Sequence, residues 1–73
     1  MKIVSLNKIQ IPDYYVKPNA IKMNIRYEYY LANKKYLVPI IVDENNVLVD
    51  GYTSYLIAKQ IKKKFVNVEV KDE

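Results

Sequence analysis

The sequence predicts an α+β fold in which two helices pack on a small mixed β-sheet, in the order β-α-β-β-α-β. Two segments, residues 19–33 and 51–63, carry apolar side chains at helical spacing. Two apolar runs, residues 36–42 and 47–49, are separated by a short polar turn, which is typical of a β-hairpin. Further strand-like runs lie near both ends of the chain. Together these observations indicate one domain over residues 1–73.

Composition limits the chemistry that this chain of 73 residues can carry out. It contains no cysteine and no histidine, which excludes disulfides, thiolate metal sites and catalysis by a thiol or an imidazole. Catalysis would have to use carboxylates, lysines, tyrosines or a metal held by oxygen ligands. Composition therefore leaves open whether the chain is an enzyme, and it favours a protein without catalysis.

Charge and hydropathy indicate the type of partner and the compartment. The net charge of +4 and the pI near 9.3 favour anionic partners such as nucleic acid or nucleotides, although many small proteins are mildly basic. No apolar run reaches membrane-spanning length. Because Lys8 and Asp13 interrupt the start of the chain, no signal peptide is predicted, and we expect a cytoplasmic protein without membrane partners.

The first half of the chain predicts a strand, a connection and a helix. Residues 2–6 fit a short strand, and residues 7–17 contain turn chemistry and are expected to be a connection. Pro18 suits the first turn of a helix, and the helical spacing continues through residues 19–33.

This first helix carries two apolar strips. One strip comprises Ala20, Met23, Tyr27, Tyr30 and Leu31, and the other comprises Ile21, Ile25 and Tyr29. A helix with two such strips is either packed from two sides or used for association. The pattern leaves open whether the chain is a monomer, a homodimer or part of a complex with another protein.

The second half predicts a hairpin. Residues 36–42 fit a strand with Pro39 at an edge or a bulge near its start. Residues 43–46, Asp-Glu-Asn-Asn, are favourable for a turn, and residues 47–49 form the return strand.

A helix and a strand complete the domain. Asp50 is predicted to be the N-cap of the helix over residues 51–63. The helical spacing places Ser54, Ile57, Ala58 and Ile61 on the core side. Residues 65–70 alternate as a closing strand, with Val66, Val68 and Val70 on one face and Phe65, Asn67 and Glu69 on the other.

This element order, with Pro39-Ile-Ile-Val42 and Val49-Asp-Gly-Tyr-Thr-Ser-Tyr-Leu-Ile-Ala58 in place, resembles the N-terminal domain of the ParB/sulfiredoxin superfamily. The resemblance covers nearly the whole chain, and its specific part is the hairpin and the helix that follows Gly51. It implies a phosphate-binding site in the loop and helix after the glycine. ParB proteins use that site for a cytidine nucleotide, and sulfiredoxins use it for ATP.

The chain departs from both family motifs at Tyr52, Thr53 and Ser54. ParB-type motifs place a glutamate and two arginines after the glycine, and sulfiredoxins place Cys-His-Arg, so sulfiredoxin chemistry is excluded here. A serine offers one neutral donor where an arginine would form two charge-assisted hydrogen bonds. We therefore expect nucleotide affinity to be lower by on the order of one to two decades. We also expect only this module, without the helix-turn-helix domain that reads operator DNA in full-length ParB proteins.

The first candidate site is the corner formed by Asp50, Gly51, Tyr52, Thr53 and Ser54, around the only glycine of the chain. In a functional interpretation, backbone N–H groups and the hydroxyls of Thr53 and Ser54 bind a phosphate at the helix N-terminus. In a structural interpretation, Asp50 caps the helix, Gly51 makes the turn, and no ligand is needed.

The second candidate site is a set of cations and tyrosines that could contact nucleic acid. It comprises Lys22, Arg26, Tyr29, Tyr30, Lys34, Lys35, Lys59, Lys62 and Lys63. Cations beside aromatic rings suit single strands without strong sequence preference. The structural interpretation is a solvated polar strip, buried tyrosines, and lysines that complement the negative end of the second helix.

The sequence thus predicts a small stand-alone ParB-like module that binds nucleic acid or a nucleotide, with no catalytic residues, no resident cofactor and no metal ligands. The one ligand of this kind that the resemblance suggests is a nucleoside triphosphate with Mg²⁺, and the loss of the motif's charged residues argues against it. The alternative function is a protein-interaction module, a homodimer or a partner-binding protein of mobile-element origin, whose ligand pocket is no longer used. A metal-dependent nuclease is the least favoured, because Asp43 and Glu44 of the turn are not expected to converge with Asp50.

Overall fold

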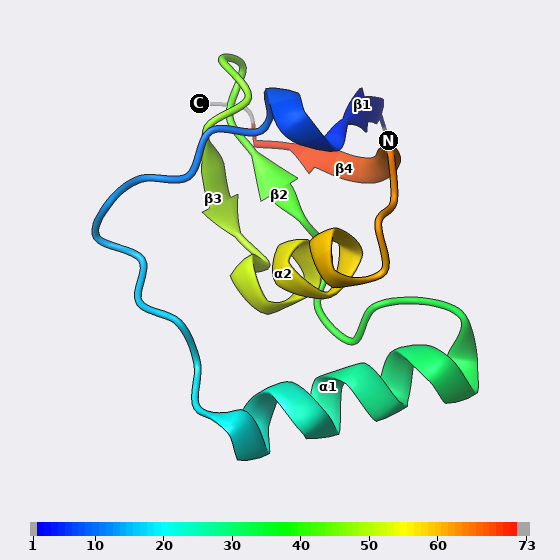
Figure 1. The fold of residues 1–73 in the computed structure, drawn as a ribbon. Coiled ribbons are helices and arrows are strands. Elements are labelled where there is room, and N and C mark those ends of the chain that lie inside the picture. The colour runs from blue at the N-terminus through cyan, green and yellow to red at the C-terminus, as the bar shows by residue number, and fades with distance from the viewer. Residues whose placement is uncertain (1, 72–73) are drawn as a thin grey trace.

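The computed structural model describes residues 2–71 and has the predicted α+β architecture, with two α-helices and a mixed sheet (Figure 1). Its elements are β1 (Lys2–Ser5), the 3-10 helix η1 (Leu6–Lys8), α1 (Ala20–Asn33), β2 (Ile41–Val42), β3 (Leu48–Asp50), α2 (Tyr52–Gln60) and β4 (Phe65–Val70). None of the helices in this part of the chain is both long and apolar enough to cross a bilayer.

The four strands form one sheet in the order β1-β4-β2-β3. The central strand β4 pairs antiparallel with β1 and parallel with β2, and β2 pairs antiparallel with β3. The alternation predicted for β4 is confirmed at Val66 and Val68, which are buried, and at Phe65, which is exposed. Val70, at the end of the strand, is exposed, although it still pairs with Val42 of β2.

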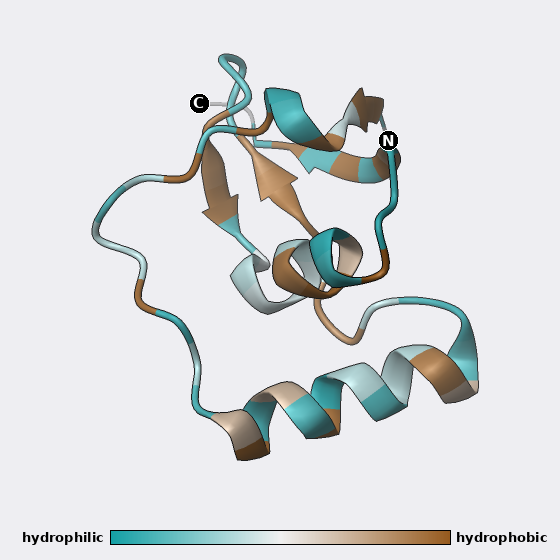
Figure 2. Cartoon of the chain, viewed as in Figure 1, coloured by the Kyte–Doolittle hydropathy of each residue, from teal (hydrophilic) through white to brown (hydrophobic). Residues whose placement is uncertain are grey.

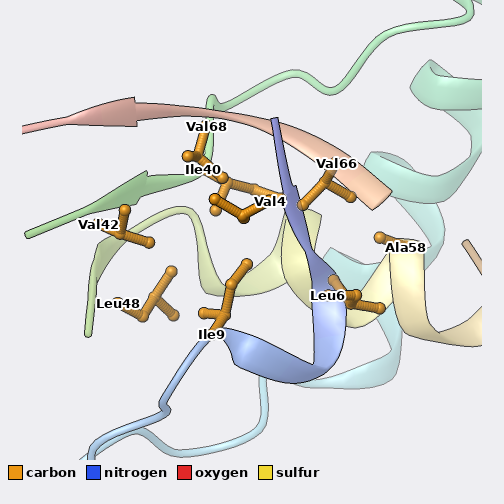
Figure 3. Packing of buried hydrophobic residues seen from close by; sticks show 9 residues of the cluster. All are labelled: Val4, Leu6, Ile9, Ile40, Val42, Leu48, Ala58, Val66 and Val68. Atoms are coloured by element: carbon orange, nitrogen blue, oxygen red, sulfur yellow. The ribbon is translucent and has the colours of Figure 1, made fainter. Parts of the chain in front are cut away.

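The core lies between one face of this sheet and α2 (Figure 3). Its buried members are Val4, Leu6, Ile9, Ile40, Val42, Leu48, Ala58, Val66 and Val68. The predicted inward face of the second helix is confirmed for Ser54, Ile57 and Ala58, whereas Ile61 is half-buried. The helix itself ends at Gln60, three residues before the predicted end.

The β2–β3 hairpin turns where predicted. The Asp43 carboxylate accepts hydrogen bonds from the N–H groups of Asn45 (2.8 Å) and Val47 (3.0 Å), and Asn46 adopts a left-handed backbone with φ 63°. Such local bonds from an Asp side chain stabilise tight turns. The strand before the turn is shorter than predicted, because residues 36–40 run past the start of α2 instead of pairing along their whole length.

Helix α1 forms an outer layer that packs on α2 rather than on the sheet (Figure 1). Its N-cap is Asn19, whose side chain accepts a hydrogen bond from the Lys22 N–H at 2.8 Å. The sequence predicts Pro18 in the first turn of this helix. Pro18 instead lies one residue before the N-cap. The helix starts after Asn19 because the side chain of Asn19 accepts a hydrogen bond from a backbone amide that would otherwise be unpaired.

No side chain of α1 is fully buried. Figure 2 shows hydrophobic and hydrophilic residues mixed along the whole helix. In the first predicted strip, Met23, Tyr27 and Tyr30 are half-buried, but Ala20 and Leu31 are exposed. In the second strip, Ile21 is 74% exposed and Ile25 is 60% exposed, while Tyr29 is half-buried. Within the described chain, α1 is therefore covered from one side only.

Candidate phosphate-binding corner and basic surface

Gly51 lies at the junction of β3 and α2, where the chain needs a glycine for two reasons. Its φ of 88° is in the left-handed region that other residues rarely adopt. A Cβ atom at this position would also collide with the Pro39 carbonyl oxygen and lie 2.8 Å from Ile40 Cα. The segment before β2 can therefore pass closely over the start of the helix only because residue 51 has no side chain.

The prediction that Asp50 caps the second helix is wrong. Gly51 is the N-cap residue, and the Asp50 carboxylate instead accepts a hydrogen bond from the Gly51 N–H at 2.8 Å. Asp50 is one residue too early to reach the first-turn amides that a cap satisfies. Over residues 2–71, no acceptor is found for the N–H groups of Tyr52, Thr53 and Ser54.

The two hydroxyls of the corner face inward. Ser54 is 2% exposed, and its hydroxyl donates to the Val38 carbonyl oxygen, so it is already used within the protein. This corrects the expectation that Ser54 would donate to a ligand. Thr53 is also buried, and its Oγ1 accepts a hydrogen bond from Arg26 Nη1 at 3.2 Å.

Arg26 is the residue of the corner that sequence reasoning missed. The sequence predicts Arg26 only as one of the nucleic-acid contacts, but the residue is half-buried, and α1 brings its guanidinium to the first turn of α2. A guanidinium has five N–H donors, of which Thr53 occupies one. No local signal could have revealed this contact, because 27 residues separate the two partners.

Four tyrosine rings form a row that includes Tyr52, the first residue of α2, and Tyr55. Tyr14 and Tyr15 stack at 5.0 Å between centroids, Tyr15 and Tyr52 are also 5.0 Å apart, and Tyr52 and Tyr55 are 6.4 Å apart. The Tyr15 hydroxyl donates to the Val49 carbonyl at 2.7 Å. Burial raises the pKa of Tyr15, with smaller contributions from Tyr14 and Asp50. Tyr52 therefore belongs to an aromatic row and is not a free side chain of the corner.

The nine predicted nucleic-acid contacts do not form one surface. Lys59, Lys62 and Lys63 line a hollow of about 670 Å³ at the end of α2. Lys34 and Lys35, together with Tyr30 and Lys63, line a second hollow of about 330 Å³. Lys22, Arg26 and Tyr29 line neither of them.

Tyr30 does not offer a free stacking surface on both sides. Its ring stacks on Tyr36 with centroids 4.9 Å apart and an angle of 27° between the planes. Burial, and to a lesser extent the neighbouring Tyr30, raise the pKa of Tyr36 to about 12. Tyr36 therefore remains a neutral phenol, and a hydrogen-bond donor, at any physiological pH.

Two carboxylates of the second half, those of Asp43 and Asp50, accept hydrogen bonds from backbone amides. Asp43 binds amides of the hairpin turn, and Asp50 binds the Gly51 amide at the other end of β3. Among residues 2–71, no group of three or more His, Cys, Asp or Glu side chains is placed to hold a metal ion.

Comparisons with protein-family models and with curated proteins give no match to this sequence. Two solved structures are similar to it over nearly its whole length. One, the C2221 crystal form of a pNOB8-like ParB-N domain, is 32% identical over 99% of this chain, with a TM-score of 0.73. The other, also a pNOB8-like ParB N-domain, is 30% identical over 94% of this chain, with a TM-score of 0.69. This chain spans 29% and 26%, respectively, of the lengths of those chains.

Proposed function

Because this chain is a ParB-like N-terminal domain in its fold, we propose that it is a small binding module that engages a phosphate of a nucleotide or of nucleic acid. The first site of the proposal is the N-terminus of α2. The observation that supports it most strongly is Arg26, which meets Thr53 beside three backbone N–H groups without an acceptor among the described residues.

The charges at the corner favour an anion. The N-terminus of a helix carries a partial positive charge, and its free amides point at an approaching anion. Arg26 adds a full positive charge whose remaining donors can form charge-assisted hydrogen bonds with phosphate oxygens. It thus offers from α1 the kind of donor that the family motif supplies from within the second helix. Asp50 opposes anion binding, but its carboxylate is engaged by the Gly51 amide.

The proposed module acts without catalysis and without a resident cofactor or metal. The chain has neither cysteine nor histidine. The carboxylates of Asp43 and Asp50 are engaged by backbone amides and lie at opposite ends of β3. A nucleoside triphosphate with Mg²⁺ would be a ligand of the corner, and the lysines at the helix ends would contribute less specific contacts with nucleic acid.

Arg26→Gln is expected to weaken nucleotide binding by about 10- to 100-fold, because it removes the charged donor of the corner. The measurement is the rise in melting temperature with each nucleoside triphosphate and Mg²⁺, since a ligand of the folded state raises that temperature by mass action. Arg26→Lys should retain part of the rise. Lys22→Gln, one turn earlier on α1, removes the same charge and should behave like the wild type.

Two results would contradict this site. One is a wild-type melting temperature that no nucleoside triphosphate raises at millimolar-range concentration. The other is an equal rise for wild type and Arg26→Gln, which would place any bound nucleotide elsewhere. The rise is compared within each variant, so that a change in basal stability from the lost Thr53 hydrogen bond does not affect the result.

The exposed strip of α1 favours a second candidate function, that of a protein-interaction module. Ile21 and Ile25 place apolar side chains on the solvent side of a helix that is covered from one side only. Such a strip is typical of association surfaces. In this case, light scattering should show a dimer whose mass falls to that of a monomer in Ile25→Asp. A wild type that is monomeric at all concentrations would contradict the homodimer.

A further inference from the structure

We propose that two hollows around Phe65 form a binding site for single-stranded nucleic acid, separate from the N-terminus of α2. The larger hollow is lined by the end of α2 and the residues after it, and the smaller one lies between the end of α1 and the start of β4. Lys63 and Phe65 line both hollows, so the two are adjacent. The C-terminal ends of the two α-helices thus converge on one exposed aromatic side chain.

The hollows concentrate the positive charge of the protein. Six of the twelve basic residues line them, namely Lys34, Lys35, Lys59, Lys62, Lys63 and Lys64. No acidic residue of the described chain lines either one. A helix dipole favours cations within the last turn, and the last turn of α2 holds only Lys59. The dipole therefore does not account for the other five lysines, whereas a phosphate backbone does.

Phe65 supplies a surface on which a base can stack. It is the first residue of β4, and its side chain is 62% exposed. An exposed aromatic ring between groups of cations is the arrangement by which proteins bind single strands without sequence preference. In a duplex the bases are already stacked on each other, so their faces cannot reach Phe65. The geometry therefore favours a single strand over a duplex.

Two of these lysines occupy positions where glycine would be more stable. Lys34 ends α1 with φ 58°, and Lys62 follows α2 with φ 61°. After α2, the N–H of Lys62 bonds to the Lys59 carbonyl (3.1 Å) and that of Lys63 to the Ala58 carbonyl (3.0 Å). This is the Schellman motif, whose left-handed position is usually glycine because other residues are strained there. Both strained lysines line the hollows, which is consistent with a use for their charge.

The inference rests on the proposed engagement of nucleic acid but not on the corner at Gly51. It is tested by fluorescence anisotropy with a labelled oligo(dT) of about 12 nucleotides, a length within the site sizes of single-strand modules. The wild type should bind at low salt, and log K should fall with log salt with a slope of about −0.7 per phosphate contacted. An unlabelled duplex of the same length should compete poorly.

Phe65→Ala is expected to weaken oligo(dT) binding by about tenfold, because a stacked base is lost. Tyr14→Ala is the matched control. Tyr14 is an aromatic residue of similar exposure, 72%, and lines neither hollow, so its removal should leave the affinity unchanged.

Lys62→Gly separates binding from stability. It should raise the melting temperature by about 4–8 °C, because it relieves the left-handed strain, and it should weaken oligo(dT) binding several-fold, because it removes a cation of the larger hollow. Weaker binding by a more stable protein cannot result from unfolding. Lys17→Ala removes the same charge outside the hollows and should leave the affinity unchanged.

Three results would overturn the inference: no oligo(dT) binding at low salt, unchanged affinity in both Phe65→Ala and Lys62→Gly, or equal affinity for single strand and duplex. Arg26→Gln distinguishes the two sites. It should abolish most of the nucleotide-induced rise in melting temperature, whereas Phe65→Ala should still weaken oligo(dT) binding about tenfold in the Arg26→Gln background. Failure of the corner alone would therefore appear as oligo(dT) binding without a nucleotide effect.

Discussion

Gly51→Ala is expected to lower the free energy of unfolding by about 3 kcal/mol or more. A left-handed backbone costs an alanine about 1–2 kcal/mol. In addition, the new Cβ would collide with backbone atoms of Pro39 and Ile40, which cannot move aside as a flexible side chain could. Such a loss is a large share of the ~5–15 kcal/mol that stabilises a typical domain. Thermal unfolding followed by circular dichroism would show it as a fall in melting temperature of more than about 12 °C.

Asn46→Ala is the control for the backbone contribution alone. Asn46 also has a positive φ, 63°, in the hairpin turn, and its replacement should cost about 1 kcal/mol. The melting temperature of Gly51→Ala could instead lie as close to that of the wild type as the melting temperature of Asn46→Ala does. In that case residues 39–40 do not pass closely over the start of α2. The corner would then have a different shape from the one on which phosphate binding is proposed.

Ser54→Arg is expected to destabilise the domain by about 3 kcal/mol or more instead of restoring a phosphate site. The family resemblance implies an arginine at this position, but Ser54 is 2% exposed and its hydroxyl donates to the Val38 carbonyl. An arginine there would either bury its charge or displace the segment that crosses the corner. Chemical denaturation, with the midpoint and slope measured for each variant, gives the change in unfolding free energy.

Ser54→Ala separates the hydrogen bond from the burial. It leaves the Val38 carbonyl without its partner and should cost about 1–3 kcal/mol, less than the arginine. A Ser54→Arg protein that unfolds like the wild type and binds nucleoside triphosphates more tightly would show that this position faces the ligand. That outcome would contradict the proposal that Arg26 is the charged donor of the phosphate site.

Much of the fold could be predicted because the relevant signals are local. The alternation of Val66 and Val68, the helical spacing of Ile57 and Ala58, and the turn after Asp43 each depend on neighbours within a few residues. The errors in α1 have a different origin. Ala20 and Leu31 have the right spacing for a buried face, but spacing does not say how much of a helix its neighbours cover.

The candidate sites were predictable only in part. The Gly51 corner was recognised from a single glycine between a strand and a helix, and a glycine there is required by both φ and close packing. The cap role of Asp50 was wrong, because a shift of one residue at the cap is decided by packing. The spacing placed Ser54 correctly on the core side, but it did not indicate that the hydroxyl donates to the Val38 carbonyl. Phe65 was placed on the outer face of its strand, but nothing local indicated the hollows on either side of it.

The sequence alone determined the two α-helices and the four strands and their order, because periodicity, turn residues and the lone glycine act over short distances along the chain. Only the tertiary structure decided that Arg26 meets Thr53 and that the lysines after both helices gather around Phe65. Arg26 and Thr53 are far apart in the chain, and so are Lys34 and Phe65. Both features depend on how α1 lies against α2 and how β4 enters the sheet, and no pattern of neighbouring residues specifies that arrangement.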